Sequence, residues 1–304
     1  MKKRVLAAVI SAVAVLGVTG CGASASSTPA DGAASAAETA EASDEAAEDS
    51  GVAGAREEAG KDEVTIKVGA NITPHAEILR EAQPLLKEQG INLEIVELED
   101  SITPNTGVIE GSLDANYFQH VPYLEQFNEE NGSDLVSIGA IHYEPFGIYA
   151  GRTTDLKDLP DGALVAVPNN VTNEARALLL LAQEGLLKLK DDAGIEATIG
   201  DIVENPKNIE FKELAPEQLV AALPDVDVAV INGNYAIEGG LHVSQALAVE
   251  ANDGLAAQTY GNIIATSPDK KDDPALAALV EVLQGSEIKA FIEGKYDGAV
   301  VPLN

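Results

Sequence analysis

Apolar and polar residues alternate along residues 64–70 (VTIKVGA) and along residues 91–98 (INLEIVEL). A period of two residues is typical of a strand with one buried face, so both segments are predicted to be strands. Between them, Thr73 and Pro74 offer a helix N-cap and a first-turn proline, and Gly90 offers a stop. The pattern therefore predicts a strand, a helix and a second strand in that order.

The same order returns in the second half of the chain. Residues 164–167 (LVAV) and 226–231 (VDVAVI) are predicted strands, and Thr172 is the expected N-cap of a helix that ends near Gly185. Strands that alternate with helices predict an α/β fold with parallel sheets covered on both faces. Ligands of such sheets bind beyond the carboxyl ends of the strands, so the residues that follow each strand are the first candidates for a site.

The first 21 residues have a different pattern, in which a basic start precedes an apolar run over residues 5–18 and small residues lead to Cys21, the only cysteine of the chain. This order is typical of a lipoprotein signal peptide, and the apolar run is shorter than the roughly 20 residues that span a bilayer. We expect Cys21 to carry a thioether-linked lipid with palmitate and to anchor the mature protein on the extracytoplasmic face of the cell membrane. An ordinary signal peptide with a chance cysteine is the alternative.

Composition changes again over residues 22–63, which lack aromatic residues, leucine and isoleucine and carry eleven acidic and two basic residues. Such a segment cannot bury enough apolar surface to offset the entropy of ordering, so we expect a disordered acidic linker. Residues 64–304 are numerous enough for two lobes, each with its own core. The formal charge of the chain, −31, argues against binding of nucleic acid or anionic lipid through surface charge.

Two groups of residues follow predicted strands and a third stands out by its composition, and all three are candidates for ligand binding. After residues 164–167 a helix begins, and Arg176 lies about one turn inside it. Free backbone N–H groups and a guanidinium fork together suit a carboxylate, although Arg176 can equally pair with Glu174 or face solvent. After residues 226–231 comes Asn232, whose amide can accept from an ammonium group or donate to a carboxylate, or can simply form a turn.

The third group is the run DANYFQHVPY at residues 114–123, which gathers three aromatic side chains and His120 in a chain that is only 4% aromatic. Such a group can form the wall of a pocket for an apolar side chain or a thioether, and it would also fit a core helix face.

Other chemistries lack a signal in the sequence. Phosphate-binding, dinucleotide-binding and nucleophile-elbow motifs are absent, and the four histidines are scattered along the chain. A zinc-carrier site is therefore not expected, nor any other metal or cofactor. No nucleophile paired with a base and no pair of carboxylates is evident near the candidate residues, so we expect a binding protein rather than an enzyme.

At this point the chain resembles a known family, the substrate-binding lipoproteins of methionine ABC transporters (the NlpA-type methionine-binding lipoproteins). The matching segments are spread over nearly all of residues 64–304: PHAEIL at 74–79, DANYFQHVPYL at 114–124, VAVPNNVTNEARALLLL at 165–181, VENPKNIEFKEL at 203–214, VDVAVINGNYA at 226–236 and VPLN at 301–304. The resemblance implies a two-lobed, periplasmic-binding-protein-like fold of type 2, with methionine enclosed in a cleft between hinged lobes. It also implies delivery of L-methionine to a membrane permease that is driven by a cytoplasmic ATPase.

The resemblance also assigns roles to individual residues. It implies that Arg176 holds the ligand carboxylate with Asn173 beside it, and that Asn232 binds the polar end of the amino acid. The ligand side chain is implied to lie against an aromatic pocket made by Phe118, His120 and Tyr123. Residues 64–150 plus 260–304 are expected to form lobe one and residues 151–259 lobe two, with crossings near residues 147–149 and 262–264 that permit hinge closure.

One position departs from the family. Members commonly have a tyrosine in a DYxxPN segment, whereas this chain has Ser101 in DSITPN. Loss of that aromatic wall leaves open a wider pocket, another apolar amino acid or a methionine-containing dipeptide as the ligand. An enzyme or an adhesin on the same two-lobed scaffold is the alternative from another functional class, because a fold does not fix a function.

Overall fold

The computed structural model describes residues 63–251 and 258–303. The expected signal peptide, the lipidation site Cys21 and the expected linker up to residue 62 lie outside the described residues. No helix within the described part combines the length and apolarity that crossing a membrane requires.

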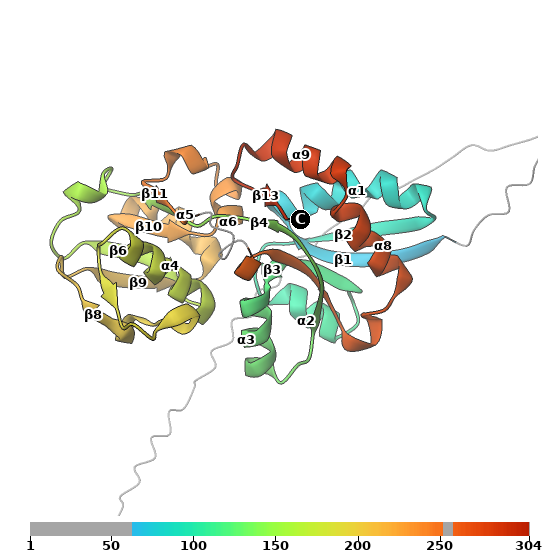
Figure 1. Ribbon diagram of the computed structural model, residues 1–304, viewed down its shortest axis with the longest axis horizontal. Helices are drawn as coiled ribbons and strands as arrows, with labels where there is room; N and C mark the ends of the chain where they lie inside the picture. The colour runs from blue at the N-terminus through green and yellow to red at the C-terminus, as the bar shows by residue number, and fades with distance from the viewer. Residues whose placement is uncertain (1–62, 252–257, 304) are drawn as a thin grey trace, which may run out of the picture. The chain divides into compact units, whose positions relative to one another are not determined.

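Lobe one is built on a six-stranded sheet with the order β13-β4-β12-β3-β1-β2 (Figure 1). Its strands are β1 (Val64–Asn71), β2 (Ile91–Leu98), β3 (Ala115–His120), β4 (Val136–Tyr143), β12 (Asn262–Thr266) and β13 (Val301–Pro302). β1 and β2 pair in parallel along their whole lengths, from Val64 opposite Ile91 to Asn71 opposite Leu98. The alternation of β2 matches one buried and one more exposed face, whereas the last four residues of β1 are all buried.

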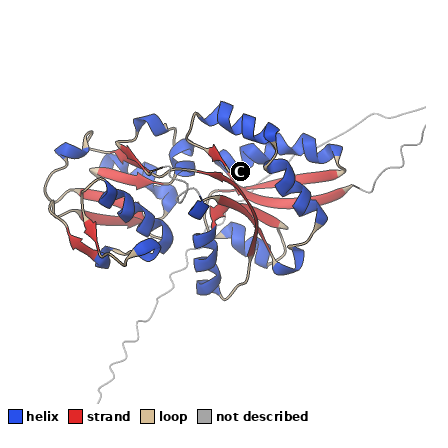
Figure 2. Ribbon diagram, viewed as in Figure 1, coloured by secondary structure: helices blue, strands red, loops and turns tan. Residues whose placement is uncertain are grey.

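Helices cover both faces of this sheet, as Figure 2 shows. They are η1 (Ile72–Ala76), α1 (Glu77–Glu88), α2 (Thr103–Ile109), α3 (Val121–Asn131), η8 (Pro268–Lys270), α8 (Pro274–Leu283) and α9 (Ser286–Tyr296). α1, α8 and α9 pack through Ile78, Leu279 and Ile288 into the larger core of the lobe. α2 and α3 pack through Val108 and Leu124 into a smaller cluster against β12.

Lobe two is built on a five-stranded sheet with the order β11-β5-β10-β6-β9. Its strands are β5 (Gly147–Ala150), β6 (Leu164–Pro168), β9 (Glu210–Leu214), β10 (Val228–Ile231) and β11 (Ala248–Val249), and β7 (Lys188–Leu189) pairs with β8 (Ile202–Glu204) beside it. Its helices are η2 (Leu156–Asp158), α4 (Val171–Gln183), η3 (Gly194–Glu196), η4 (Ile199–Asp201), η5 (Pro216–Gln218), α5 (Leu219–Ala222), η6 (Leu223–Asp225), α6 (Gly233–Glu238) and η7 (Val243–Gln245). α4 packs on one face of the sheet, and α5 and α6 pack on the other.

The sheets are mixed, which corrects the prediction of parallel sheets. β1, β2 and β3 are parallel, as are β6, β9 and β10. In lobe one, β12 pairs antiparallel with both β3 and β4, and β13 pairs antiparallel with β4. In lobe two, β5 pairs antiparallel with both β10 and β11. These strands carry the chain between the lobes or close a sheet, so their direction is set by long-range pairing and not by a strand–helix–strand unit.

The two sheets are joined by two segments. The chain leaves lobe one after Tyr143 at the end of β4 and enters lobe two at Gly147 in β5. It leaves lobe two after Val249 in β11 and re-enters lobe one at Asn262 in β12. Residues 147–149 and 262–264, expected at the crossings, are thus strand residues, and β5 belongs to the second sheet although residues 64–150 were assigned to lobe one.

Element boundaries differ from the prediction at three points. α4 begins at Val171 with Asn170 as its N-cap, so Thr172 is the second helical residue and not the cap. The strand expected at residues 226–231 begins two residues later, at Val228. Thr73 has extended backbone torsions, as expected for an N-cap, but a turn over Ile72–Ala76 precedes the regular helix, which begins at Glu77.

Candidate functional site

All six residues proposed to bind ligand line one cavity, to which both lobes contribute. Its space between atoms is about 460 Å³, open solvent at its entrance included. The wall from lobe one includes Phe118, His120 and Tyr123, and the wall from lobe two includes Asn173, Arg176 and Asn232. Strand ends and helix starts place these side chains, because β3 ends at His120, α4 begins at Val171 and β10 ends at Ile231.

Arg176 is the charged centre of the cavity. It is only 3% exposed, and its Cζ atom lies 4.1 Å from the ring centroid of Phe146 and 4.4 Å from that of Tyr260. Its Nε and Nη2 donate to the carboxylate of Glu250, at 2.9 and 2.6 Å, and Nη2 also donates to the main-chain oxygen of Glu144 at 2.8 Å. The two aromatic rings close to the guanidinium and its bidentate hydrogen bonds to a carboxylate fix the orientation of the guanidinium group.

The alternative that Arg176 pairs with Glu174 or solvent is wrong. The Glu174 carboxylate instead accepts a hydrogen bond from the backbone N–H of Ile199. Burial opposes the charged form of Arg176, but the neighbouring Glu250 outweighs burial, and the pKa of Arg176 is raised. Burial raises the pKa of Glu250, but Arg176 and the hydrogen bonds from Tyr143 and Phe146 together outweigh burial, so the pKa of Glu250 lies below its ordinary value. Both groups are therefore charged at neutral pH.

His120 links the two lobes across the cavity. It caps α3 by accepting from the Tyr123 backbone N–H through Nδ1, so Nε2 carries the proton and donates to Asn173 Oδ1 at 3.0 Å. Burial, followed by the charge of Arg176, lowers the pKa of His120 to about 4. The imidazole is thus a neutral, fixed part of the wall and a structural bridge from β3 to α4.

Aromatic edges form the apolar side of the cavity. The rings of Phe118 and Tyr123 meet edge to face with centroids 5.9 Å apart, and the ring of His120 lies 6.4 Å from that of Tyr123. The hydroxyl of Tyr123 donates to the main-chain oxygen of Ser101 at 2.7 Å. Ser101 lines this cavity and also an adjoining one. The small side chain at position 101 therefore lies at the boundary between the two cavities.

Two amide oxygens in the cavity wall have no protein partner. The Oδ1 atoms of Asn232 and Asn170 are buried and accept no hydrogen bond, although both residues line the cavity. A buried acceptor without a donor costs about 1–3 kcal/mol, which a ligand or water that donates to it would recover. Asn232 was expected from the sequence, whereas Asn170 was passed over as part of a helix start.

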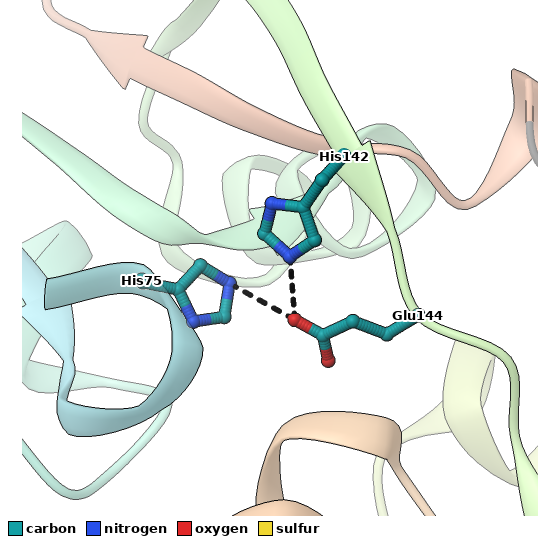
Figure 3. A group of neighbouring side chains, drawn as sticks. All are labelled: His75, His142 and Glu144. Carbon is teal, nitrogen blue, oxygen red and sulfur yellow. Dashed lines mark hydrogen bonds and ion pairs between the residues drawn. The ribbon is translucent and has the colours of Figure 1, made fainter. Parts of the chain in front are cut away.

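Sequence reasoning missed a cluster of three buried side chains that reaches the cavity wall. His75, which lies in η1, and His142 in β4 both point toward Glu144, as Figure 3 shows. All three are buried, and Glu144 lines the cavity. Arg176 contacts this cluster through the main-chain oxygen of Glu144, while the carboxylate that it pairs with is that of Glu250. The available signal was His142 and Glu144 at the end of an apolar strand; His75 lies far away in sequence.

The three side chains have the composition of a metal site, with ligand atoms within 4.8 Å of one another. Their hydrogen bonds oppose that role. Nε2 of His142 lies 2.6 Å from Glu144 Oε1, and Nε2 of His75 faces Glu144 Oε1 at 3.5 Å and Asn262 Oδ1 at 3.1 Å. Since these partners are acceptors, each Nε2 carries a proton and has no lone pair for a metal ion.

Comparisons with known proteins match this arrangement. The methionine-binding lipoprotein MetQ of Bacillus subtilis is 46% identical over 252 residues, which are 81% of this chain and 90% of that protein. The D-methionine-binding lipoprotein MetQ of Escherichia coli is 37% identical over 248 residues, 79% of this chain and 89% of that protein. A solved structure of a nutrient-binding protein from Burkholderia cenocepacia, bound to methionine, is 41% identical with a TM-score of 0.75 and covers 79% of this chain and 100% of its own.

The fold of these relatives is a two-lobed periplasmic-binding-protein fold, and the present chain has the same architecture. Residues 66–304 match the family described as NlpA lipoprotein. Because this match covers more than half of the chain and the relatives share well over 30% of its residues, the chain belongs to the NlpA lipoprotein family.

Proposed function

We propose that this chain is the substrate-binding lipoprotein of an ABC importer and that it captures L-methionine and delivers it to the permease and its ATPase. The observation that carries the proposal is one cavity that combines a buried guanidinium, buried amide acceptors without partners and an aromatic wall. Each part matches one part of methionine: the carboxylate, the ammonium group and the thioether side chain.

The proposed pose follows from the positions of the side chains. The ligand carboxylate lies on Arg176, with Asn173 beside it at the start of α4. The thioether lies against the edges of Phe118 and Tyr123 and beside His120. The polar end of the amino acid meets the free Oδ1 atom of Asn232. Ligand groups thus contact both lobes, so binding favours the closed form over any form in which the lobes are apart.

The anchor and the linker belong to the same proposal. Cys21 is the lipidation site that holds the protein on the extracytoplasmic face of the cell membrane, and residues 22–63 connect it to the binding domain. A flexible chain of this length has a root-mean-square reach of about 35 Å, which lets the binding domain meet a permease near its anchor. Like charges on the linker extend it further.

A ligand larger than methionine is the second candidate, because a specific feature favours it. An adjoining cavity of about 970 Å³, open solvent included, shares Ser101, Tyr123, Asn170 and Pro216 with the first. A tyrosine at position 101 would take up space where the two cavities share lining residues, whereas serine is small. A methionine-containing dipeptide or another apolar amino acid therefore has room here that a narrower family member would deny it.

Calorimetry tests the proposal. The intact chain in detergent, freed of carried-over ligand by unfolding and refolding, is titrated with L-methionine, D-methionine and a methionine dipeptide. Micromolar or tighter binding of L-methionine, on the order of −8 kcal/mol, that is lost in Arg176→Ala supports the carrier and its carboxylate site. Arg152→Ala is the matched control, since Arg152 is a half-exposed arginine of lobe two outside the cavity. Binding of the dipeptide alone would support the second candidate, and turnover of a bound compound would support an enzyme.

A further inference from the structure

Glu144 is a buried carboxylate in the cavity wall to which the pose above gives no role. It lies in the short segment that joins β4 to β5, and it is 5% exposed. Figure 3 shows that one carboxylate oxygen receives the interactions of both His75 and His142, while the second oxygen points away from them. Both histidines therefore hold the side chain at the same oxygen.

Every neighbour that holds this carboxylate is a hydrogen-bond donor. His142 donates from Nε2, while its Nδ1 accepts from the hydroxyl of Tyr117. The protonated Nε2 of His75 donates to Asn262 Oδ1 and lies 3.5 Å from Glu144 Oε1, and the backbone N–H of Asn234 donates to Glu144. Burial lowers the pKa of His142 to about 3 and that of His75 to about 4, so both histidines are neutral donors. A carboxylate that receives only donors is arranged for its ionised form.

The cavity lacks a cation to match this charge. Among the described residues that line the cavity or back Arg176, the charged side chains are Arg176, Glu250 and Glu144. Glu250 already pairs with the guanidinium, and Arg176 reaches Glu144 only at its main-chain oxygen. Burial raises the pKa of Glu144 despite the opposing effects of His75, Asn234 and Arg176, which shows that the protein alone does not fully compensate the buried charge.

The surroundings of the second oxygen suit an ammonium group. Oε2 of Glu144 faces Gly233, where a Cβ atom would lie 3.3 Å from it and 2.7 Å from Glu144 Cβ. Any side chain at position 233 would thus displace the carboxylate. Asn232, the next residue, presents its buried Oδ1 atom without a partner to the same cavity. An ammonium group has three donors and requires several acceptors within one small region.

We propose that Glu144 binds the α-ammonium group of the amino acid ligand, that Asn232 Oδ1 shares this group, and that His75 and His142 are positioning residues for the carboxylate. This assignment rests on the proposed function. It also fits the chemistry of an α-amino acid, in which ammonium and carboxylate are attached to one carbon. The main chain of Glu144 contacts Arg176, and its side chain offers the negative charge, so one residue helps to place both ends.

The assignment narrows the substrate class to free α-amino acids. If the ligand carboxylate binds Arg176, Glu144 requires a positively charged ammonium group, and an acylated nitrogen carries no such charge. N-acetyl-methionine and peptides with a C-terminal methionine would place a neutral amide against a buried carboxylate and leave it unpaired. The adjoining cavity next to Ser101 would then not accommodate an amino-terminal extension of the ligand.

A cycle of two ligands and two proteins tests this assignment. The ligands are L-methionine and its 2-hydroxy analogue, 2-hydroxy-4-methylthiobutanoate, which keeps the carboxylate and thioether but has no ammonium group. The intact chain is expected to prefer L-methionine by on the order of 100-fold, because the analogue leaves a buried charge unpaired. In Glu144→Gln the preference is expected to fall to within a few-fold, mainly through weaker binding of L-methionine.

Two further variants make the result specific. Glu250→Gln removes the other carboxylate near Arg176 and should change the affinity for both ligands by a similar factor, so the preference survives. Glu144→Asp keeps the charge and should retain more of the preference than Glu144→Gln, which also serves if the glutamine variant folds poorly. Thermal melting of each variant without ligand checks the fold.

The outcomes separate the two proposals. Failure of the intact chain to bind either compound overturns the proposed function and this assignment with it. Binding of both compounds with equal affinity, or a preference that Glu144→Gln leaves intact, overturns only the assignment to Glu144. Tight binding of N-acetyl-methionine would do the same. Loss of the preference in Glu144→Gln with its survival in Glu250→Gln supports the assignment.

Discussion

Glu250→Gln should make the ligand-free protein less stable and at the same time tighten methionine binding. Glu250 neutralises Arg176, and the two side chains are 12% and 4% exposed. Removing one partner of a buried pair leaves the other charge uncompensated, which costs about 3–5 kcal/mol when burial is complete. Because glutamine retains some hydrogen bonds and Glu250 is partly exposed, we expect the free energy of unfolding to fall by about 2–3 kcal/mol.

The opposite effect on binding arises because the ligand carboxylate and Glu250 would share one guanidinium. Two like charges on the order of 5 Å apart repel by about 3 kcal/mol at an effective dielectric constant of 20. Removing half of that repulsion corresponds to roughly a tenfold gain in affinity. Methionine should therefore stabilise the variant more than it stabilises the natural chain.

Urea denaturation with and without L-methionine, together with calorimetric titration, measures both effects. Glu204→Gln is the matched control, because Glu204 pairs with Lys188 on the surface and both side chains are more than half exposed. We expect that control to change the free energy of unfolding by less than about 1 kcal/mol. Unchanged stability in Glu250→Gln, or a loss of methionine affinity as large as in Arg176→Ala, would refute the reasoning.

Three further predictions concern protonation, specificity and closure. Burial lowers the pKa of His75 and His120 to about 4 and that of His142 to about 3. Below about pH 6.5 the unfolded chain therefore binds more protons than the folded one, and the free energy of unfolding should decrease as the pH is lowered, by up to about 1.4 kcal/mol per pH unit per histidine. The raised pKa of Glu144 offsets part of this decrease. Urea denaturation at pH 7, 6 and 5 measures this slope, and a slope of zero or of opposite sign would contradict it. Ser101→Tyr should tighten methionine binding by about 1 kcal/mol, whereas Ser101→Ala should not; calorimetry on both variants decides. Small-angle scattering should show a smaller radius of gyration with methionine, and superimposable profiles would exclude hinge closure.

Local sequence patterns predicted several elements of the fold and six residues of the site. The alternation over residues 91–98 predicted β2 (Ile91–Leu98) without error, because burial of one sheet face imposes a period of two on the residues themselves. Arg176 and Asn232 were found because each follows a strand, and strand ends meet at the edge where ligands bind. The run from Phe118 to Tyr123 was found because it gathers aromatic residues in a chain that has few of them.

Helix cap positions and strand directions were harder to predict from the sequence. The N-cap of α4 is Asn170 although Thr172 has a suitable side chain, since either can begin a helix and the preceding strand decides which does. The antiparallel direction of β12 between β3 and β4 depends on how the chain crosses between the lobes. No short stretch of sequence encodes that crossing.

The sequence by itself determined the alternation of strands and helices, the family, and six of the side chains that line the cavity, because these depend on patterns within short segments. Only the tertiary structure decided that Glu250 is the partner of Arg176, 74 residues away, and that His75 lies against Glu144. Such contacts arise when the tertiary fold brings segments together that are far apart in sequence. The side chains that meet have no periodic or spacing relation to each other. Charge balance in the cavity is for that reason a property of the folded protein and not of any segment of it.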